Sequence, residues 1–416
     1  MSDAFLGRQP ILDRNQQLCA YELLFRSSQQ NAANFSDGRA ATATVIRNLF
    51  SELSLRDVLG PYRGYVNVDQ ELLFSDVLEI LPTDTVALEI LETVAPTPEV
   101  VARCAELVQI GYTLALDDII QLGPDYQTLV PHIAVVKVDL KAVDQQKLPA
   151  LVATIKKLGM KALAEKVDNR DEMQRCFDLG FDYFQGYFFA KPVVIQGKKL
   201  DHSQLALMRL INLLISDAET NALEDVFKRE PGLTLNLLRL TNSVSSGLAV
   251  RVTSLRHAIT LLGRRQLQRW LQLLLYTAGG KSNGINPLLQ MAAARGRFME
   301  LAAEKLAAGD KSFADHAFMT GILSLTPALL SQRIETIVES LTLHKNVQDA
   351  LCNRTGQLGA LLSAAERLEA PHEADNPATL LDDLMPQLPG LRMEDINLRL
   401  IKALAWANNI GQEADN

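Results

Sequence analysis

Asp117 and Asp118 are adjacent carboxylates that directly follow the short strand-like run 113–116. The same arrangement, a strand-like run that ends in a polar side chain, recurs along the first half of the chain. The polar residues at these positions are Asn67, Glu89, Asp117, Lys137, Glu165 and Gln185. By subtraction of their residue numbers, successive members are 22, 28, 20, 28 and 20 residues apart, about the length of one strand, one helix and two loops. The spacing predicts repeated β-α units, each with a polar residue at or near the carboxyl end of its strand.

These side chains would meet, because the carboxyl ends of the strands in a (β/α)8 barrel converge on one face. Glu22, Asp118 and Asp139 complete the predicted constellation. Carboxylates about 4 Å apart repel by roughly 4 kcal/mol per pair at an effective dielectric constant of 20. They must therefore protonate, spread apart or share cations. Oxygen ligands of this kind suit Mg²⁺ or Mn²⁺, and no His or Cys belongs to the set.

Two basic residues among these acids indicate an anionic substrate. Arg26 can form a forked contact with a phosphate, and Lys137 can act as a point charge on water or phosphate. Together the residues predict metal-assisted hydrolysis of a phosphodiester, in which a carboxylate-held cation generates the hydroxide.

Each residue also has a purely structural interpretation. A single carboxylate at a strand end is more often an ordinary solvated residue. Lys137 and Asp139 could form only a cross-strand ion pair, and Glu22 and Arg26 could be neighbours at a sheet edge. The regular placement over six β-α units favours a shared site over these separate explanations.

The composition is that of an ordinary globular protein with room for two domains. The chain has 416 residues, of which 48% are apolar and 22% charged. Its net charge of −8 argues against a nucleic-acid polymer or an anionic membrane as partner. No apolar run approaches the roughly 20 residues of a membrane span, the start lacks a signal-peptide pattern, and the four cysteines are far apart. We expect a cytoplasmic protein without membrane insertion, disulfide framework or zinc site.

Alternation of strands and helices is confined to the first half of the chain. Residues 5–26 predict a β-hairpin, and a helix is expected at about 39–53. Two further helices are predicted at 98–110 and 147–158, because Gly111 and Gly159 stand just past their ends.

Beyond residue 203 nearly every segment has helical periodicity. Leu267, Trp270, Leu271 and Leu274 form one apolar stripe. The stretch 309–330 is predicted to be helical up to Pro327, and 370–377 to be a polar loop. The predicted fold is thus an α/β (β/α)8 barrel followed by an all-α domain. The predicted boundaries are 1–195 for the barrel domain, 196–203 for a linker, 204–405 for the all-α domain and 406–416 for a C-terminal tail.

The first half resembles an EAL domain, the barrel of cyclic-di-GMP phosphodiesterases, over almost all of 1–195. The signature E-x-L-x-R runs from Glu22 to Arg26, with Leu23 in place of the usual alanine. The resemblance implies Mg²⁺ or Mn²⁺ held by Glu22, Asn67, Glu89, Asp117 and Asp118. It implies Lys137 and Glu165 as catalytic residues, with Glu165 as general base, and Arg26 and Gln185 as substrate-binding residues. Glu92 matches the glutamate that steadies the loop after the paired aspartates.

That loop departs from the family pattern, which is rich in glycine with a phenylalanine. Here 119–124 reads Ile-Ile-Gln-Leu-Gly-Pro, and Asp168 stands where a second glutamate is usual. Two β-branched residues do not easily take positive φ, and Pro124 stiffens the segment. We expect Asp118 to be held by its backbone alone and any hydrolysis to be slow.

The second half resembles an HDOD domain, through patterns at 223–240, 255–275 and 318–323. Related metal phosphohydrolases need a His-Asp dyad. None of the six histidines is followed by Asp, and Ser324-Leu325 stands where the dyad would follow. We therefore predict no second metal centre here and expect protein partners to bind through this domain.

Two functions remain open at this point. In the first, the barrel hydrolyses cyclic-di-GMP to linear pGpG and the HDOD domain regulates it or recruits partners. In the second, a catalytically degenerate adaptor acts through nucleotide or protein binding. The complete ligand set favours the enzyme, whereas the altered loop at 119–126 favours the adaptor. A homodimer is compatible with both.

Overall fold

The computed structural model describes residues 4–27, 55–190, 202–244, 254–277, 286–369 and 380–410, without the side chains of 4–6, 25–27 and 242–244. The predicted helix at 39–53, the predicted loop at 370–377 and most of the predicted linker lie outside these ranges. The chain forms two compact units, Met1–Lys191 with Ser363–Asn416, and Pro192–Leu362. Residues 363–405, which the sequence grouped with the helical domain, therefore fall in the unit of the barrel.

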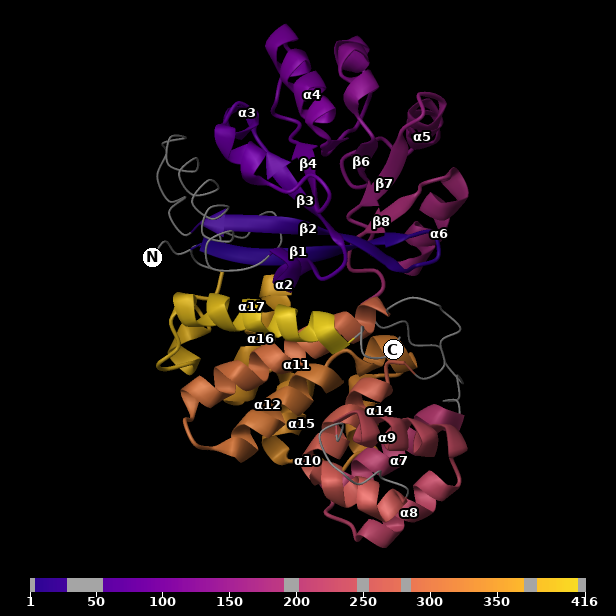
Figure 1. The fold of residues 1–416 in the computed structure, drawn as a ribbon, viewed down its shortest axis with the longest axis vertical. Coiled ribbons are helices and arrows are strands. Elements are labelled where there is room, and N and C mark those ends of the chain that lie inside the picture. Colours follow the sequence, from indigo (N-terminus) through magenta and orange to yellow (C-terminus); the bar gives the residue numbers. More distant parts are fainter. Residues whose placement is uncertain are drawn as a thin grey trace. The chain divides into compact units, whose positions relative to one another are not determined.

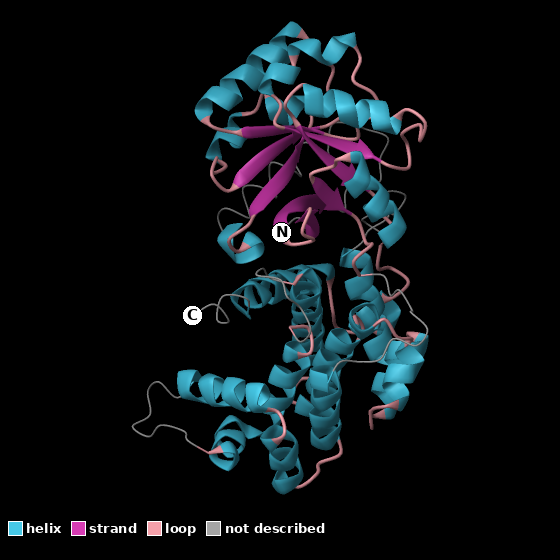
Figure 2. Cartoon of the chain, turned by 90° about the vertical axis from the view of Figure 1, so that its right-hand side faces the viewer, coloured by secondary structure: helices cyan, strands magenta, loops and turns pink. Residues whose placement is uncertain are grey.

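Eight strands form a closed barrel in sequence order (Figures 1 and 2). They are β1 (Ala4–Asp13), β2 (Leu18–Ser27), β3 (Arg63–Val68), β4 (Val86–Ile90), β5 (Thr113–Leu116), β6 (Val135–Asp139), β7 (Lys161–Glu165) and β8 (Tyr183–Gln185). Strand β1 is antiparallel to both β2 and β8, and all other pairs are parallel. The structure confirms the predicted hairpin and the predicted barrel.

Short helices connect the strands. They are α2 (Leu55–Leu59), α3 (Gln70–Leu73), η1 (Asp76–Ile80), α4 (Pro98–Ile110), η2 (Pro124–Thr128), η3 (Val130–His132), α5 (Leu148–Lys157) and α6 (Arg170–Leu179). The ends of α4 follow from its sequence. Thr97 caps it by accepting from the N–H of Val100, Pro98 occupies the first turn, and Gly111 ends it at φ 112°. Gly159, at φ 83°, has the positive φ that its place after α5 predicted.

An apolar layer fills the barrel beneath its carboxyl-end face. Seven strands each contribute one buried residue to it: Ile11, Ala20, Tyr65, Ala87, Ala115, Val135 and Leu163. Side chains two positions apart on a strand point to the same face. The residues two positions beyond six of these layer members therefore also point into the barrel, and they are the predicted polar residues Glu22, Asn67, Glu89, Asp117, Lys137 and Glu165.

The last helix of the chain, α17 (Met393–Ile410), packs against α2 and β1 in the barrel unit (Figure 1). Buried Asn408 donates from Nδ2 to the carbonyl oxygens of Asp57 at 2.7 Å and Val58 at 3.1 Å. Its Oδ1 accepts from Arg8 Nη1 at 3.0 Å, and Arg8 also donates to the Val58 carbonyl. The amide of Asn408 thus joins the end of the chain to β1 and to the start of the described segment 55–190. Residues 406–410, predicted as tail, are helical.

The second unit is entirely helical in its described residues. Its elements are α7 (His202–Ile215), α8 (Thr220–Lys228), α9 (Pro231–Val244), α10 (Leu255–Leu274), α11 (Pro287–Leu306), α12 (Lys311–Leu323), α13 (Thr326–Leu330), α14 (Ile334–Glu339), α15 (Lys345–Asn353) and the first part of α16 (Gly356–Glu369). Helices α11 and α12 cross where Gly321 meets Gly296, since a Cβ on Gly321 would lie 2.6 Å from the Gly296 Cα.

The stretch predicted to be helical up to Pro327 forms two helices with a break between them. Helix α12 ends at Leu323, and α13 begins at Thr326 with Pro327 in its first turn. Proline lacks an N–H and therefore starts a helix more readily than it continues one. The stretch Lys311–Leu330 is long and apolar enough to span a membrane by length and composition, but 72% of its most apolar window is buried inside the fold, as in a core helix.

Replacing Asn408 by alanine should destabilise the barrel unit. The change removes the partner of the Asp57 carbonyl and one partner each of Val58 and Arg8. Because a buried polar group left unpaired costs about 1–3 kcal/mol, we expect the free energy of unfolding of this unit to fall by about 2 kcal/mol.

The two tryptophans of the chain, Trp270 and Trp406, lie in different units, so Trp406 fluorescence in a Trp270→Phe background reports urea unfolding of the barrel unit. Asn409 is the exposed neighbour of Asn408 on the same helix, and Asn409→Ala is the matched control. An equal or larger loss in the control would contradict a specific role for the Asn408 amide.

Candidate functional site

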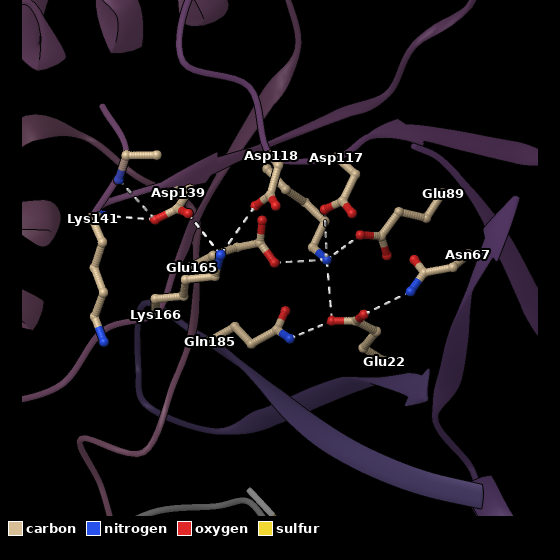
Figure 3. Close-up of polar contacts among 12 residues, drawn as sticks. Glu22, Asn67, Glu89, Asp117, Asp118, Asp139, Lys141, Glu165, Lys166 and Gln185 are labelled. Atoms are coloured by element: carbon tan, nitrogen blue, oxygen red, sulfur yellow. Dashed lines mark hydrogen bonds and ion pairs between the residues drawn. The ribbon is translucent and has the colours of Figure 1, made fainter. Parts of the chain in front are cut away.

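The predicted polar side chains point toward one another (Figure 3). Hydrogen bonds and ion pairs join Glu22, Asn67, Glu89, Asp117, Lys137, Glu165 and Gln185 into one cluster. The cluster draws one residue from each of the seven strands β2 to β8, with Asp117 just beyond the end of β5, and these residues converge as the spacing predicted. The chemical roles assigned to these residues from the resemblance stay predictions.

The ammonium group of Lys137 lies at the centre of the cluster. Its Nζ is 2.8 Å from Glu165 Oε1, 3.2 Å from Glu22 Oε2 and 3.3 Å from Asp117 Oδ1. It also contacts Glu89, and the lysine side chain is fully buried. Burial alone would lower the pKa of Lys137, but the surrounding carboxylates outweigh burial and raise that pKa above its ordinary value.

Two amides fix the position of Glu22 in this cluster. Gln185 Nε2 donates to Glu22 Oε2 at 2.5 Å, and Asn67 Nδ2 donates to Glu22 Oε1 at 3.1 Å. The same Gln185 nitrogen donates to Gln9 Oε1 at 2.9 Å, which ties β8 to β1 across the closure of the barrel. Gln9 was not predicted as a site residue, because nothing in its local sequence distinguishes it from a surface glutamine.

The cluster carries an excess of negative charge. Four carboxylates surround one ammonium group, so three negative charges remain uncompensated when all are ionised. Burial and the neighbouring acids raise the pKa of Glu89, and burial likewise raises that of Glu165. Asp117 differs, because Lys137 and hydrogen bonding outweigh its burial and lower its pKa. A second cation would relieve this repulsion.

Several buried oxygens of the cluster also lack a donor. Asn67 Oδ1, Glu89 Oε2, Glu165 Oε2 and Gln185 Oε1 accept no hydrogen bond. One oxygen from each of Glu22, Glu89 and Glu165 can lie within 4.8 Å of the others, and the same holds for Glu92, Asp117 and Asp118. Carboxylate and amide oxygens without donors are the ligands that hard divalent cations take. The residues present therefore fit a divalent cation.

Asp118 lies beside this cluster and pairs with a different ammonium group, that of Lys166. Its Oδ1 is 3.7 Å from the Lys166 ammonium, which is also 2.7 Å from Asp139 Oδ2 (Figure 3). Burial, together with neighbouring Asp117, raises the pKa of Asp118 to about 6. The expectation that Asp118 is held by its backbone alone is wrong, because Lys166 holds its carboxylate as well.

The loop after the paired aspartates is anchored to the barrel. The left-handed residue is Asp118 (φ 44°), and neither isoleucine that follows has positive φ. Ile119 is buried and donates its N–H to the Lys137 carbonyl at 2.9 Å, and Pro124 opens the 3₁₀ helix η2. The anchored Ile119 limits how far this loop can move.

Arg26 and Asp168, both singled out in the sequence, are not part of the central cluster as described. The backbone of Arg26 lies in β2, but its side chain is outside the described residues, so its contact with substrate stays a prediction. Asp168 pairs with Lys141 at 2.9 Å on the exposed side of the site.

The chain matches two known domain families. The EAL domain family model matches residues 9–192, and the HDOD domain family model matches residues 200–355. The chain is 30% identical over 418 residues to the cyclic di-GMP phosphodiesterase CdgJ of Vibrio cholerae, covering 99% of this chain and 94% of that protein. It is 29% identical over 414 residues to the uncharacterized protein YuxH of Bacillus subtilis, covering 98% of each.

Among solved structures, the chain is similar to a standalone versatile EAL protein from Vibrio cholerae O395 in its c-di-GMP bound form. The sequence identity is 22% and the TM-score is 0.36, over 46% of this chain and 92% of the solved one.

Divalent cations should stabilise the barrel through the donor-free oxygens. At a concentration one hundred times its dissociation constant, a bound ion adds about 2.7 kcal/mol to the free energy of unfolding. We expect MnCl₂ to raise the unfolding midpoint of the wild type in differential scanning calorimetry. Glu89→Gln should unfold no earlier than wild type without metal, because it removes one excess charge, yet gain much less from Mn²⁺.

The control is Glu79→Gln, which neutralises a half-exposed carboxylate on η1. It should gain as much from Mn²⁺ as the wild type. A Glu89→Gln variant that responds to Mn²⁺ like this control would place the cation elsewhere.

Proposed function

This chain belongs to the family of proteins that join an EAL domain to an HDOD domain, and we propose that its barrel hydrolyses cyclic-di-GMP to the linear dinucleotide pGpG. The observation that carries the proposal is the buried cluster around Lys137, in which four carboxylates share one ammonium group and four acceptor oxygens lack donors. The family resemblance and the similarity to CdgJ support the substrate.

In this proposal Glu22, Asn67, Glu89 and Asp117 hold Mg²⁺ or Mn²⁺, with Asp118 as a further ligand. A bound divalent cation supplies charge neutralisation and a water of lowered pKa. The amides of Asn67 and Gln185 keep Glu22 oriented for this task. The Asn67 oxygen, which has no donor, points away from that bond and is free to serve as a ligand.

Glu165 and Lys137 act on the attacking water. Glu165 uses Oε1 to contact Lys137 at 2.8 Å, while its Oε2 accepts no hydrogen bond and can receive a proton. Lys137 orients that carboxylate and offers positive charge to the phosphate. Arg26 is proposed to clamp the phosphate, and Gln185 to contact the substrate beside it.

A non-catalytic adaptor is the second candidate function. It is favoured by the loop at 119–124, where buried Ile119 and the rigid Pro124 restrain a segment that the family keeps mobile. In that case the barrel would bind the nucleotide without turning it over, and the HDOD domain would carry the output to a protein partner.

In both cases the HDOD domain is proposed to regulate the barrel or to recruit partners. We propose that the protein acts in the cytoplasm, which is consistent with its four free cysteines. A homodimer remains compatible with either function.

Incubation of the purified protein with cyclic-di-GMP and Mn²⁺ should yield pGpG, detected by anion-exchange chromatography. Glu165→Gln should lower kcat by about 10²–10⁴-fold, the usual contribution of a general base. Glu22→Gln should abolish turnover, because it removes a ligand that three neighbours orient. The exposed-site variant Glu79→Gln should keep wild-type turnover. Tight nucleotide binding by calorimetry, with no pGpG from wild type in Mn²⁺ or Mg²⁺, would establish the adaptor instead.

Replacing residues 119–124 with a glycine-rich segment should raise turnover, because the anchored loop would then move when metal and substrate bind. The expected gain is in kcat, with little change in the affinity of the Glu22 site for Mn²⁺. Pro124→Ala alone separates the stiffness of proline from the anchoring of Ile119. A graft that slows a fast wild-type enzyme would refute the restraint attributed to this loop.

A further inference from the structure

Lys166 directly follows the proposed general base and places a second ammonium group at the site. Its Nζ lies 2.7 Å from Asp139 Oδ2 and 3.7 Å from Asp118 Oδ1 (Figure 3). The side chain is 24% exposed, so solvent screens these ion pairs only in part. Lys166 was not predicted as a site residue, because a lysine after a strand end is usually solvated.

The backbone of Lys166 holds this side chain in place. Its φ of 56° is left-handed, a conformation that residues other than glycine rarely adopt. The next residue, Val167, donates its N–H to the Gln185 carbonyl at 3.0 Å. Gly186 (φ 147°) packs so closely that a Cβ there would lie 2.2 Å from the Val167 oxygen. Packing against β8 thus fixes the turn, and the turn brings Lys166 to the aspartates.

Asp118 therefore has two alternative sources of positive charge. One is the Lys166 ammonium, and the other is a divalent cation held with Asp117 and Glu92, whose oxygens can gather within 4.8 Å of Asp118. The two cannot both sit against Asp118 without repelling each other. When a cation binds at Asp118, Lys166 can keep its ion pair with Asp139. Its Oδ1 is already anchored by the N–H groups of Lys141 at 2.7 Å and Ala142 at 3.2 Å.

We propose that Lys166 is a tethered cation that competes with the second of two divalent ions for Asp118, and so sets the concentration of metal at which the centre fills. The inference rests on the proposed metal centre. The first ion is proposed to bind at Glu22, Asn67 and Glu89, whereas the described ion pairs join Lys166 to Asp118 and Asp139. Lys166 therefore weakens the second binding step and leaves the first unchanged.

A merely structural role predicts a different result. If Lys166 only links the loops after β6 and β7 through Asp139, its removal would lower stability without changing the ratio of the two metal affinities. The stepwise binding of Mn²⁺ separates the two roles, because it does not depend on turnover.

The test is a titration of the purified full-length protein with Mn²⁺, in which electron paramagnetic resonance counts the free ion. Wild type should bind one Mn²⁺ per chain tightly and a second one more weakly. Lys166→Met, which keeps the stem and removes the charge, should tighten the second step by about three- to tenfold and leave the first unchanged. Lys166→Arg should retain the wild-type pattern.

Lys166→Gly gives an independent version of the test, because glycine suits the left-handed backbone and the variant should fold even if the methionine variant does not. It should tighten the second step as Lys166→Met does. Gln16→Gly is its matched control, since exposed Gln16 has φ 59° in the β1–β2 turn and the change relieves the same backbone conformation without touching the acids.

An unchanged or weakened second step in both neutral variants overturns the proposal while leaving the first site, and with it the proposed function, intact. Absence of the first step in wild type removes the metal centre itself and overturns both. A tightened second step in Gln16→Gly would assign the effect to backbone relief and also refute the role of the Lys166 charge.

Discussion

The contact on which the site depends is the buried ammonium group of Lys137 among four carboxylates. A lone carboxylate in such a place would protonate, and a lone lysine would lose its charge. Here each group favours the charged form of the other. Removing the ammonium would therefore leave four acids facing one another without compensation. The arrangement is nevertheless unbalanced, with four acids to one base. That imbalance is the physical basis of the proposed cation site.

The barrel provides the rigidity that such a cluster needs. Each acid follows, by two residues, a side chain of the apolar layer, so the same strand alternation that fills the barrel also aims the polar groups. Pairing of β1 with β8 closes the barrel and places Gln185 where it donates hydrogen bonds to both Gln9 and Glu22. On the outer side, α17 holds β1 and α2 through Asn408. The end of the chain therefore supports the strand on which the barrel closes.

Strand spacing was sufficient to predict the barrel and the central acids, because both depend on local alternation and on the convergence of parallel strands. Contacts between distant segments were not predictable in this way. Asn408 is an ordinary helix residue in sequence, and its partner Asp57 is 351 positions away. The left-handed turn at Lys166 depends on packing against Gly186. The helix break after Leu323 depends on Pro327, which lies in the first turn of α13. For Asn408 and Lys166 the deciding neighbour lies outside the local pattern.

Charge balance links these features to the proposed chemistry. Among the described side chains, two ammonium groups, those of Lys137 and Lys166, form ion pairs with six acids at the mouth of the barrel: Glu22, Glu89, Asp117, Asp118, Asp139 and Glu165. When all are ionised, four negative charges are in excess, and a cyclic dinucleotide adds one more for each of its two phosphates. One divalent ion would leave the mouth still repelling such a substrate, whereas two would neutralise it before the substrate arrives. Binding of the nucleotide and filling of the second metal position should therefore be coupled, each favouring the other. A lysine that competes for that second position would act on substrate affinity as well, through its ion pairs with Asp118 and Asp139.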